Sequence, residues 1–206
     1  VQTNLLVEGF YTILDDVFAL RDMDDAADGG KVKERYNGSG ATVRGFNVEG
    51  RAAFTRWFEL QAGVTLQQSR YKEPEFWSED AEVPPVRRMF RTPDAYGYFT
   101  ASFKPVRNFT ADLSGTCTGS MLVQHMAGSG VAQDVAVSTP SFFDMNIRLS
   151  YDVRIYKEIT MQLYGGVQNL FNAYQKDFDK GVDRDSGYIY GPSLPRSWFV
   201  GAKFSF

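Results

Sequence analysis

Long apolar runs are missing from this 206-residue sequence, and cysteine and histidine are almost missing. No run approaches the 18 or more apolar residues of a membrane-spanning helix. The single cysteine, Cys117, excludes an intrachain disulfide framework. With one histidine, His125, the chain has no histidine cluster for a metal, and it lacks nucleophile-elbow and phosphate-loop motifs. We therefore expect no enzyme and no resident cofactor.

The charge balance excludes another class of partner. The net charge is −3, which argues against a general nucleic-acid binder. The chain begins Val1-Gln2-Thr3, without an initiator Met and without the charged and apolar regions of a signal peptide. The expectation is that a signal was removed or that the sequence is a piece of a longer protein.

Alternation of apolar and polar residues is the main pattern that is present. In the stretch from Leu194 to Phe206 one face is apolar and the other is small or charged, although Phe199 falls on the polar side. The apolar face consists of Trp198, Val200, Ala202, Phe204 and Phe206. A period of two predicts a β-strand with one apolar face. An apolar face opposite a small or charged face is typical of a transmembrane barrel strand.

The same alternation predicts about eight strands, and their connections are sorted by length. The predicted strands are residues 3–18, 39–54, 60–66, 91–103, 109–123, 144–155, 159–171 and 194–206. Connections are long after the first, third, fifth and seventh strands and short after the second, fourth and sixth; the first long one holds Asp24, Asp25 and Asp28. Tight turns on one rim and long loops on the other indicate an outer-membrane β-barrel rather than a soluble sandwich. This parity places Phe206 on the periplasmic rim.

The polar face indicates a wide barrel. Small groups such as Thr110, Ser114 and Thr116 would leave voids inside a closed eight-stranded barrel, whose narrow interior side chains must fill. We therefore expect the strands to form an arc of a larger antiparallel transmembrane barrel. The alternative is a free-standing eight-stranded barrel with a structural or adhesive role.

Several motifs carry a family resemblance. Residues 165–175 read GGVQNLFNAYQ, and they are followed by DFDKG at 177–181 and YIYGP at 188–192. With the terminal Phe206, these motifs resemble the end of TonB-dependent outer-membrane receptors, particularly those of Bacteroidetes. Cys117 departs from the resemblance, since a Tyr is expected there.

The resemblance implies the C-terminal part (residues 1–206) of a 22-stranded barrel that closes around an N-terminal plug absent from this sequence. Such a receptor uses energy from the TonB protein to import a vitamin, a siderophore or other metal chelate, haem or a glycan across the outer membrane. Its last strand, here carrying Trp198, Val200, Ala202, Phe204 and Phe206, resembles the signal read by the barrel-assembly machinery, and an exposed β-edge suits recognition by strand addition.

Two sets of loop residues are candidates for binding. For the small-molecule or glycan ligand they are Tyr188, Tyr190, Arg184 and His125, although the tyrosines also fit an aromatic girdle and His125 an ordinary polar rim position. For a calcium ion they are Asp177, Asp179, Asp183 and Asp185, whose alternating spacing could present oxygen ligands. The EF-hand pattern is incomplete, so a solvated acidic loop tied to Arg184 and Arg196 is the alternative to calcium.

Overall fold

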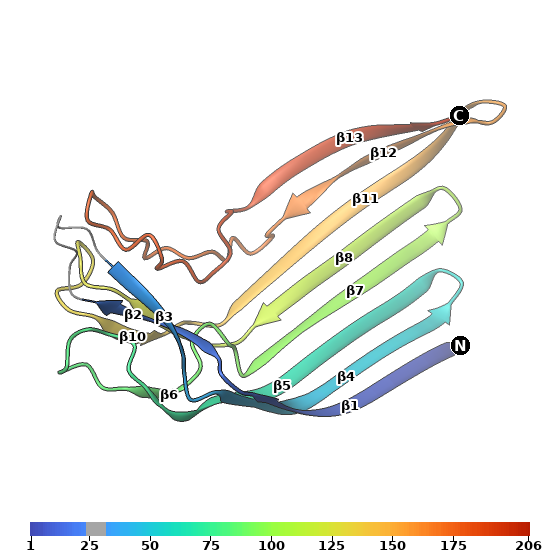
Figure 1. Cartoon of the computed structure of the whole chain (residues 1–206). Helices are drawn as coiled ribbons and strands as arrows, with labels where there is room; N and C mark the ends of the chain where they lie inside the picture. Colours follow the sequence, from blue (N-terminus) through green and yellow to red (C-terminus); the bar gives the residue numbers. More distant parts are fainter. Residues whose placement is uncertain (24–31) are drawn as a thin grey trace.

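The computed structural model describes residues 1–23 and 32–206, and its secondary structure consists of β-strands (Figure 1). Asp24, Asp25 and Asp28 lie outside the described residues. Within those ranges no helix is long and apolar enough to cross a membrane. The strands are β1 (Gln2–Leu14), β2 (Phe18–Met23), β3 (Val32–Asn37), β4 (Ala41–Thr55), β5 (Phe58–Glu75), β6 (Val86–Arg88), β7 (Ala95–Val106), β8 (Phe109–Thr118), β9 (Leu122–His125), β10 (Val135–Ser138), β11 (Phe142–Tyr156), β12 (Ile159–Gln168) and β13 (Ser197–Ser205).

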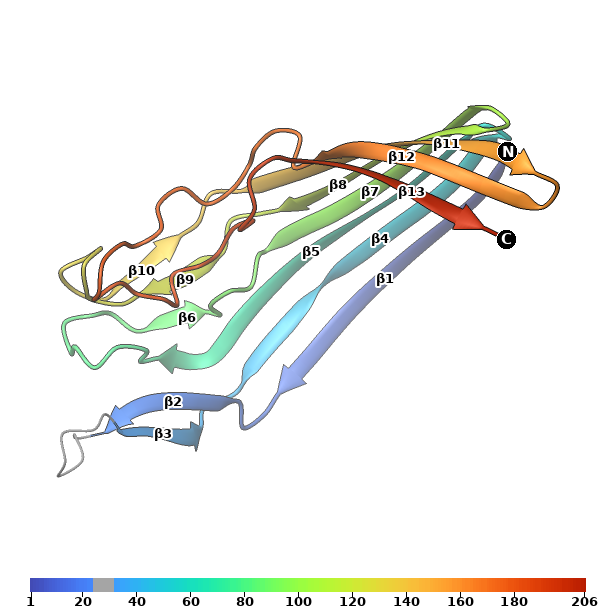
Figure 2. The same cartoon turned by 90° about the horizontal axis from the view of Figure 1, so that it is seen from above.

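Eight of these strands form one long antiparallel sheet in the order β1-β4-β5-β7-β8-β11-β12-β13, so each strand pairs with the next long strand along the chain. Figures 1 and 2 show that the sheet curves into an arc. The end strands β1 and β13 do not pair with each other, so this chain forms no closed eight-stranded barrel. The predicted set of eight antiparallel strands in a barrel arc is confirmed.

The sorting of connections by length is also confirmed. Three hairpins close through two-residue turns, pairing Thr55 with Phe58, Val106 with Phe109 and Tyr156 with Ile159, each beside a register shift in the strand. A β-bulge of this kind bends the strand and increases its twist. The long connections lie at the opposite end of the sheet and contain the short strands β2, β3, β6, β9 and β10 (Figure 1).

Several predicted strand ends are wrong. The third predicted strand, residues 60–66, extends in the structure to Glu75, because β5 keeps pairing with β4 as far as Tyr71 and also pairs with β6. The strand predicted at 109–123 stops at Thr118, and residues 122–125 form the separate strand β9, which pairs with β10.

Backbone conformation explains two further differences. The first strand was predicted to reach Phe18, but β1 ends at Leu14, and Asp16 has a φ of 52°. The seventh was predicted to reach Phe171, but β12 ends at Gln168 because Asn169 has a φ of 50°. A residue in this left-handed region leaves the extended conformation, and Asn and Asp enter it more readily than other non-glycine residues.

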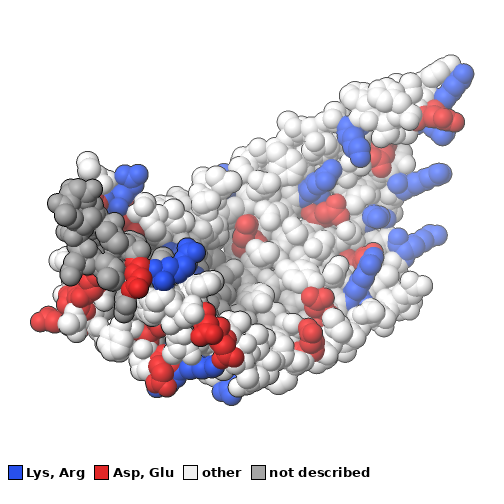
Figure 3. Space-filling model, in the orientation of Figure 1, with Lys and Arg blue, Asp and Glu red and all other residues white. Residues whose placement is uncertain are grey.

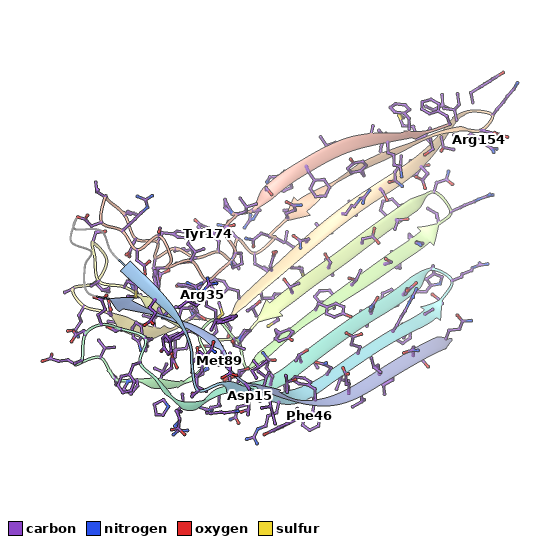
Figure 4. The ribbon with its side chains drawn as sticks, in the orientation of Figure 1. Asp15, Arg35, Phe46, Met89, Arg154 and Tyr174 are labelled. Carbon is purple, nitrogen blue, oxygen red and sulfur yellow. The ribbon has the colours of Figure 1, made fainter. Side chains whose placement is uncertain are left out.

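The two faces of the sheet have different chemistry. One lateral row across the outer face runs Val7, Val48, Val64, Gly97, Cys117 and Phe143. Phe46 lies on the same outer face, where Figure 4 shows its side chain directed away from the sheet. At the edge of the sheet, Val200 is 90% exposed on this face. Large apolar groups in such exposed positions suit contact with lipid, as the alternation predicted.

The inner face carries polar pairs and also accommodates Phe199, the residue that breaks the sequence pattern. Asn47 donates a hydrogen bond to Glu8 (3.0 Å) and accepts one from Thr65 (2.8 Å), which links three neighbouring strands. The Phe199 ring lies over Gly166, where an added Cβ would stand 2.8 Å from the ring and 2.0 Å from a backbone oxygen. The aromatic ring therefore covers the space above a glycine instead of disturbing a polar contact.

The two faces predict losses of stability of different size for the same new charge. Val64→Arg places a cation on the apolar face of β5, whereas Gln61→Arg places it on the polar face of the same strand. At mid-membrane depth we expect Val64→Arg to lower the free energy of unfolding by about 2–4 kcal/mol. Gln61→Arg is the matched control and should cost less than about 1 kcal/mol. Urea unfolding in lipid vesicles measures both variants, and equal losses would contradict the assignment of the faces.

Candidate functional site

The long connections pack against one another at the loop end of the sheet and enclose a cluster of polar side chains. We call His125, Gln175, Asp177, Asp179, Tyr188 and Tyr190 the loop cluster. β9 ends at His125, and the connection between β12 and β13 supplies the other five residues. Contacts between this connection and His125 at the end of β9 hold its path.

His125 anchors the connection to β9. Its Nε2 lies 3.0 Å from Asp179 Oδ1, and its ring stacks on Tyr188 with centroids 3.7 Å apart and planes 8° apart. His125 is 6% exposed and Tyr188 is 4% exposed. The other carboxylate oxygen of Asp179 accepts the Asp185 backbone N–H at 3.1 Å. Both oxygens of Asp179 are therefore used to hold the chain in place.

Asp177 accepts two phenol hydrogen bonds. Tyr188 donates to Oδ2 at 3.1 Å and Tyr190 to Oδ1 at 2.6 Å. Burial raises the pKa of Tyr188 to about 12, and the hydrogen bond to Asp177 and its negative charge act in the same direction. The pKa of Tyr190 is raised for the same reasons. Both phenols therefore stay protonated donors at neutral pH.

The pKa values of the two carboxyl groups, Asp177 and Asp179, are shifted in the opposite direction to those of the tyrosines. Burial alone would raise the pKa of Asp177, but hydrogen bonds from Tyr190 and Tyr188 outweigh it and lower the pKa below its usual value. Burial likewise opposes ionisation of Asp179, and the hydrogen bonds from the Asp185 backbone and His125 lower its pKa overall. Both groups are anions at neutral pH, and their charge strengthens the hydrogen bonds that close the loop.

Two further contacts complete the cluster. Gln175, 1% exposed, donates through Nε2 to the Tyr188 carbonyl (3.0 Å) and accepts the Tyr190 N–H (2.9 Å). Arg91, from the connection between β5 and β7, donates to the Ile189 carbonyl (2.7 Å) and to the Gly187 carbonyl. Three long connections are thus joined, and these contacts give the loop end a defined shape.

The structure brings three of the four predicted ligand residues together. His125, Tyr188 and Tyr190 meet in the loop cluster, with the first two almost fully buried. Arg184 lies outside it, exposed and donating to the Gly181 carbonyl at 3.1 Å. The contacts of the buried pair position the loop, and ligand binding by these four residues stays a prediction.

The four predicted calcium ligands are separated by their other contacts. Asp177 binds tyrosine hydroxyls, Asp179 binds His125, and Asp185 accepts the backbone N–H groups of Met126 (2.8 Å) and Gly187 (2.7 Å). Asp183 is exposed. In the part of the chain that the structure describes, no three His, Cys, Asp or Glu side chains form a group that could hold a metal ion. Calcium binding stays a prediction.

The predicted assembly residues Trp198, Val200, Ala202, Phe204 and Phe206 lie near or on the edge strand β13 and are all exposed. Trp198, Val200, Ala202 and Phe204 share the outer face, opposite Val167, Gly165, Leu163 and Met161 of β12. No strand in the described part of the chain pairs with the other side of β13. An open edge with an apolar face is thus present, and its recognition by an assembly machinery stays a prediction.

Two residues with structural roles at this end were missed as site residues. In the sequence Gln175 is only one member of a motif, because its amide contacts reach residues 13 and 15 positions further along the chain. Asn169 donates to the carbonyls of Ala173 (3.1 Å) and Leu194 (2.9 Å) and accepts the Ala173 N–H (2.8 Å). The signal for Asn169 was available, because Asn at the end of an alternating run suits a left-handed residue that stops a strand.

The concave face below the loops contains a hollow. It has a volume of about 660 Å³ and is lined by Asp112, Asp144 and Arg148 from β8 and β11 and by residues 192–195 of the last connection, among others. One carboxylate oxygen of Asp144 is buried without a hydrogen-bond partner among residues 1–23 and 32–206. A buried carboxylate oxygen normally has a partner, so a polar group from outside the described chain fits this position.

Comparisons with known proteins support the fold. No protein-family model matches the chain, and no curated protein sequence matches it. Its structure is similar to the ferric-catecholate import receptor Fiu from E. coli K12, with a TM-score of 0.63 and 19% identity over 97% of this chain and 25% of that chain. The siderophore receptor PiuA from Acinetobacter baumannii gives 0.61 and 17% over 97% and 25%.

A third solved structure is the outer-membrane ferripyoverdine receptor of Pseudomonas aeruginosa, with a TM-score of 0.63 and 12% identity over 97% of this chain and 24% of that chain. The chain spans about a quarter of the length of these structures. Identities this low establish the fold alone: an arc of the β-barrel found in TonB-dependent outer-membrane receptors.

The pKa shifts predict acid opening of the loop cluster. The pKa values of Asp177 and Asp179 lie below the ordinary value of 3.8, so their stabilisation is complete above that pH and is lost as the pH falls through the folded values. Amide hydrogen exchange of residues 175–190, corrected for intrinsic rates, should change little between pH 7 and 5 and rise several-fold at pH 3. Amides of β4 and β5 serve as the internal reference. Asp177→Asn with Asp179→Asn should remove the pH dependence; its survival would contradict the assignment.

Asn169 allows a separate test of backbone strain. Asn169→Gly removes the side-chain hydrogen bonds and should lower the free energy of unfolding by about 1–2 kcal/mol. Asn169→Ala removes the same bonds and, unlike the glycine variant, keeps a Cβ in the left-handed region. This should cost roughly 1 kcal/mol more than Asn169→Gly. Denaturant unfolding of the two variants gives the difference, and an alanine variant as stable as the glycine variant would be the contrary result.

Proposed function

We propose that this chain is the C-terminal part of a TonB-dependent receptor barrel in the bacterial outer membrane, of the Bacteroidetes type, and that the receptor imports a scarce nutrient. The observation that carries the proposal is the arc itself: apolar outside, polar inside, with long loops on one rim. That arc superimposes on import receptors over 97% of its length. The neighbours are receptors and transporters, which favours transport over an enzyme.

The open edges of the sheet support a larger barrel. β1 and β13 each have a partner on one side only, and unpaired backbone groups are costly in the hydrocarbon layer. Further strands of the same receptor would close both edges. An N-terminal plug would fill the interior and supply polar partners to the concave face, including the free Asp144 oxygen. The plug would also provide the contact with TonB.

The loop end would form part of the ligand site. Interlocked loops with a buried polar cluster give a surface of fixed shape, which lowers the entropic cost of binding. Fiu is named a ferric-catecholate import receptor and PiuA a siderophore receptor, so a metal chelate such as a siderophore leads the candidates. A vitamin, haem and a glycan are the other candidates. We propose Arg184 and Tyr190, which solvent can reach, as ligand contacts. Calcium bound by the last long connection remains a separate proposal.

A free-standing structural or adhesive barrel is the second candidate. The observation that favours it is the number of strands in the described sheet. Eight strands are enough for a small closed barrel. It would need β1 to pair with β13, a pairing that the structure does not contain. An enzymatic role has less support: among the described residues the His125 ring has Asp179 as its only hydrogen-bond partner, and no hydroxyl group bonds to the ring.

Energy-dependent uptake separates these candidates. We expect cells that express the complete reading frame to accumulate one of the candidate nutrients, and removal of TonB to abolish accumulation while ligand binding at the cell surface persists. Radiolabelled uptake and surface binding in strains with and without TonB measure the two steps. Uptake that continues without TonB, or a purified chain that refolds alone to a closed monomer with β1 paired to β13, would contradict the proposal.

A further inference from the structure

Each of the three two-residue turns carries its own basic side chain. The first residue of each turn is basic: Arg56, Arg107 and Lys157. All three side chains are exposed, and none lies within ion-pair distance of a carboxylate in the described part of the chain. The Lys157 ammonium lies 5.1 Å from the centre of the Tyr156 ring. Figure 3 shows basic side chains projecting at this end of the sheet, and Figure 4 places Arg154 beside the last turn.

Each cation has an exposed apolar neighbour. Trp57 is 43% exposed, Val106 59% and Tyr156 61%. Each of the three hairpins has a strand on either side in the sheet, so the open edges of the arc do not cause this exposure. Trp57 is fixed edge-on against Phe103, with ring centroids 5.3 Å apart, and therefore presents a constant surface.

A second basic residue adds to the first turn. The Lys104 N–H donates to the Trp57 carbonyl at 2.7 Å, which brings the end of β7 against the turn between β4 and β5. The Lys104 side chain is exposed and, like Arg56, has no acidic partner among the described residues. Glu158 is the one acidic residue in the three turns. The rim therefore has an excess of positive charge next to apolar surface.

We propose that the rim formed by these turns binds the headgroups of anionic phospholipids in the leaflet that it meets. Basic groups attract the phosphate and the net negative charge, and tryptophan and tyrosine rings sit at the level of the headgroups with their apolar bodies against the acyl chains. A water-soluble anion would use the cations but would leave Trp57, Val106 and Tyr156 in water. The inference rests on the proposed function only in that the chain spans a membrane.

Lipid retention by the complete receptor tests this surface. Native mass spectrometry of the detergent-purified protein, titrated with phosphatidylglycerol or phosphatidylcholine of the same acyl chains, gives the two affinities. We expect several-fold preference for phosphatidylglycerol. Each cation near the surface is worth roughly fivefold in affinity, so Arg56→Gln with Arg107→Gln and Lys157→Gln should remove most of the preference. The preference of the unaltered protein should also fall with added salt, which screens charges at the headgroup level.

A charge-matched control lies on the other rim. Arg87→Gln with Lys176→Gln and Lys180→Gln removes three exposed loop cations and should leave the preference unchanged. Absence of preference or of salt dependence in the unaltered protein overturns the inference, as does an equal loss in the control. Binding of peptidoglycan sacculi that the turn variant alone loses, with lipid retention intact, would assign the rim to the cell wall and overturn it too. Uptake by the same variants reports separately on the proposed transport function.

Discussion

The pairing of backbone hydrogen-bonding groups is the constraint on which the rest of the structure depends. A polypeptide that crosses hydrocarbon has no water to satisfy its N–H and C=O groups, so each strand needs a partner on both sides. Among the described strands of the main sheet the ladder runs unbroken from β1 to β13, and the outer sides of those two strands are open. Continuous pairing fixes the register, and the register in turn places every second side chain on one face, as with Val48 between Val7 and Val64.

That coupling explains why much of the fold could be predicted from the sequence. Alternation is a local property, so the faces of β11 and β13 follow directly from residues two positions apart. Strand ends do not follow, because they depend on partners far away in the sequence. β5 continues to Glu75 only because β4 and β6 lie beside it, and β12 stops where Asn169 adopts a left-handed conformation.

The loop cluster depends on contacts that alternation does not encode. Residue type singled out His125, Tyr188 and Tyr190, but the stacking of His125 on Tyr188 joins positions 63 residues apart. Their side chains bind one another and the backbone, so chemistry that suggests a ligand contact in a sequence serves here to hold loops together. Gln175 carried no signal at all, since an amide that satisfies two backbone groups looks like any polar loop residue.

The two ends of the sheet therefore differ in the interactions that they contain. At the loop end, the buried polar groups of the loop cluster bond to one another and to the backbone, and the cost of burying Asp179 is offset by fixed donors, which gives the connection a single shape. At the turn end the residues of the three turns are exposed, and in the proposed membrane setting an apolar band alone would let the wall shift along the membrane normal. Cations beside exposed aromatic rings resist that shift, because moving inward desolvates charge and moving outward exposes apolar surface to water. In the proposed membrane setting, the turns would set the depth of the wall and hold the loops at the opposite rim at a constant height above the membrane.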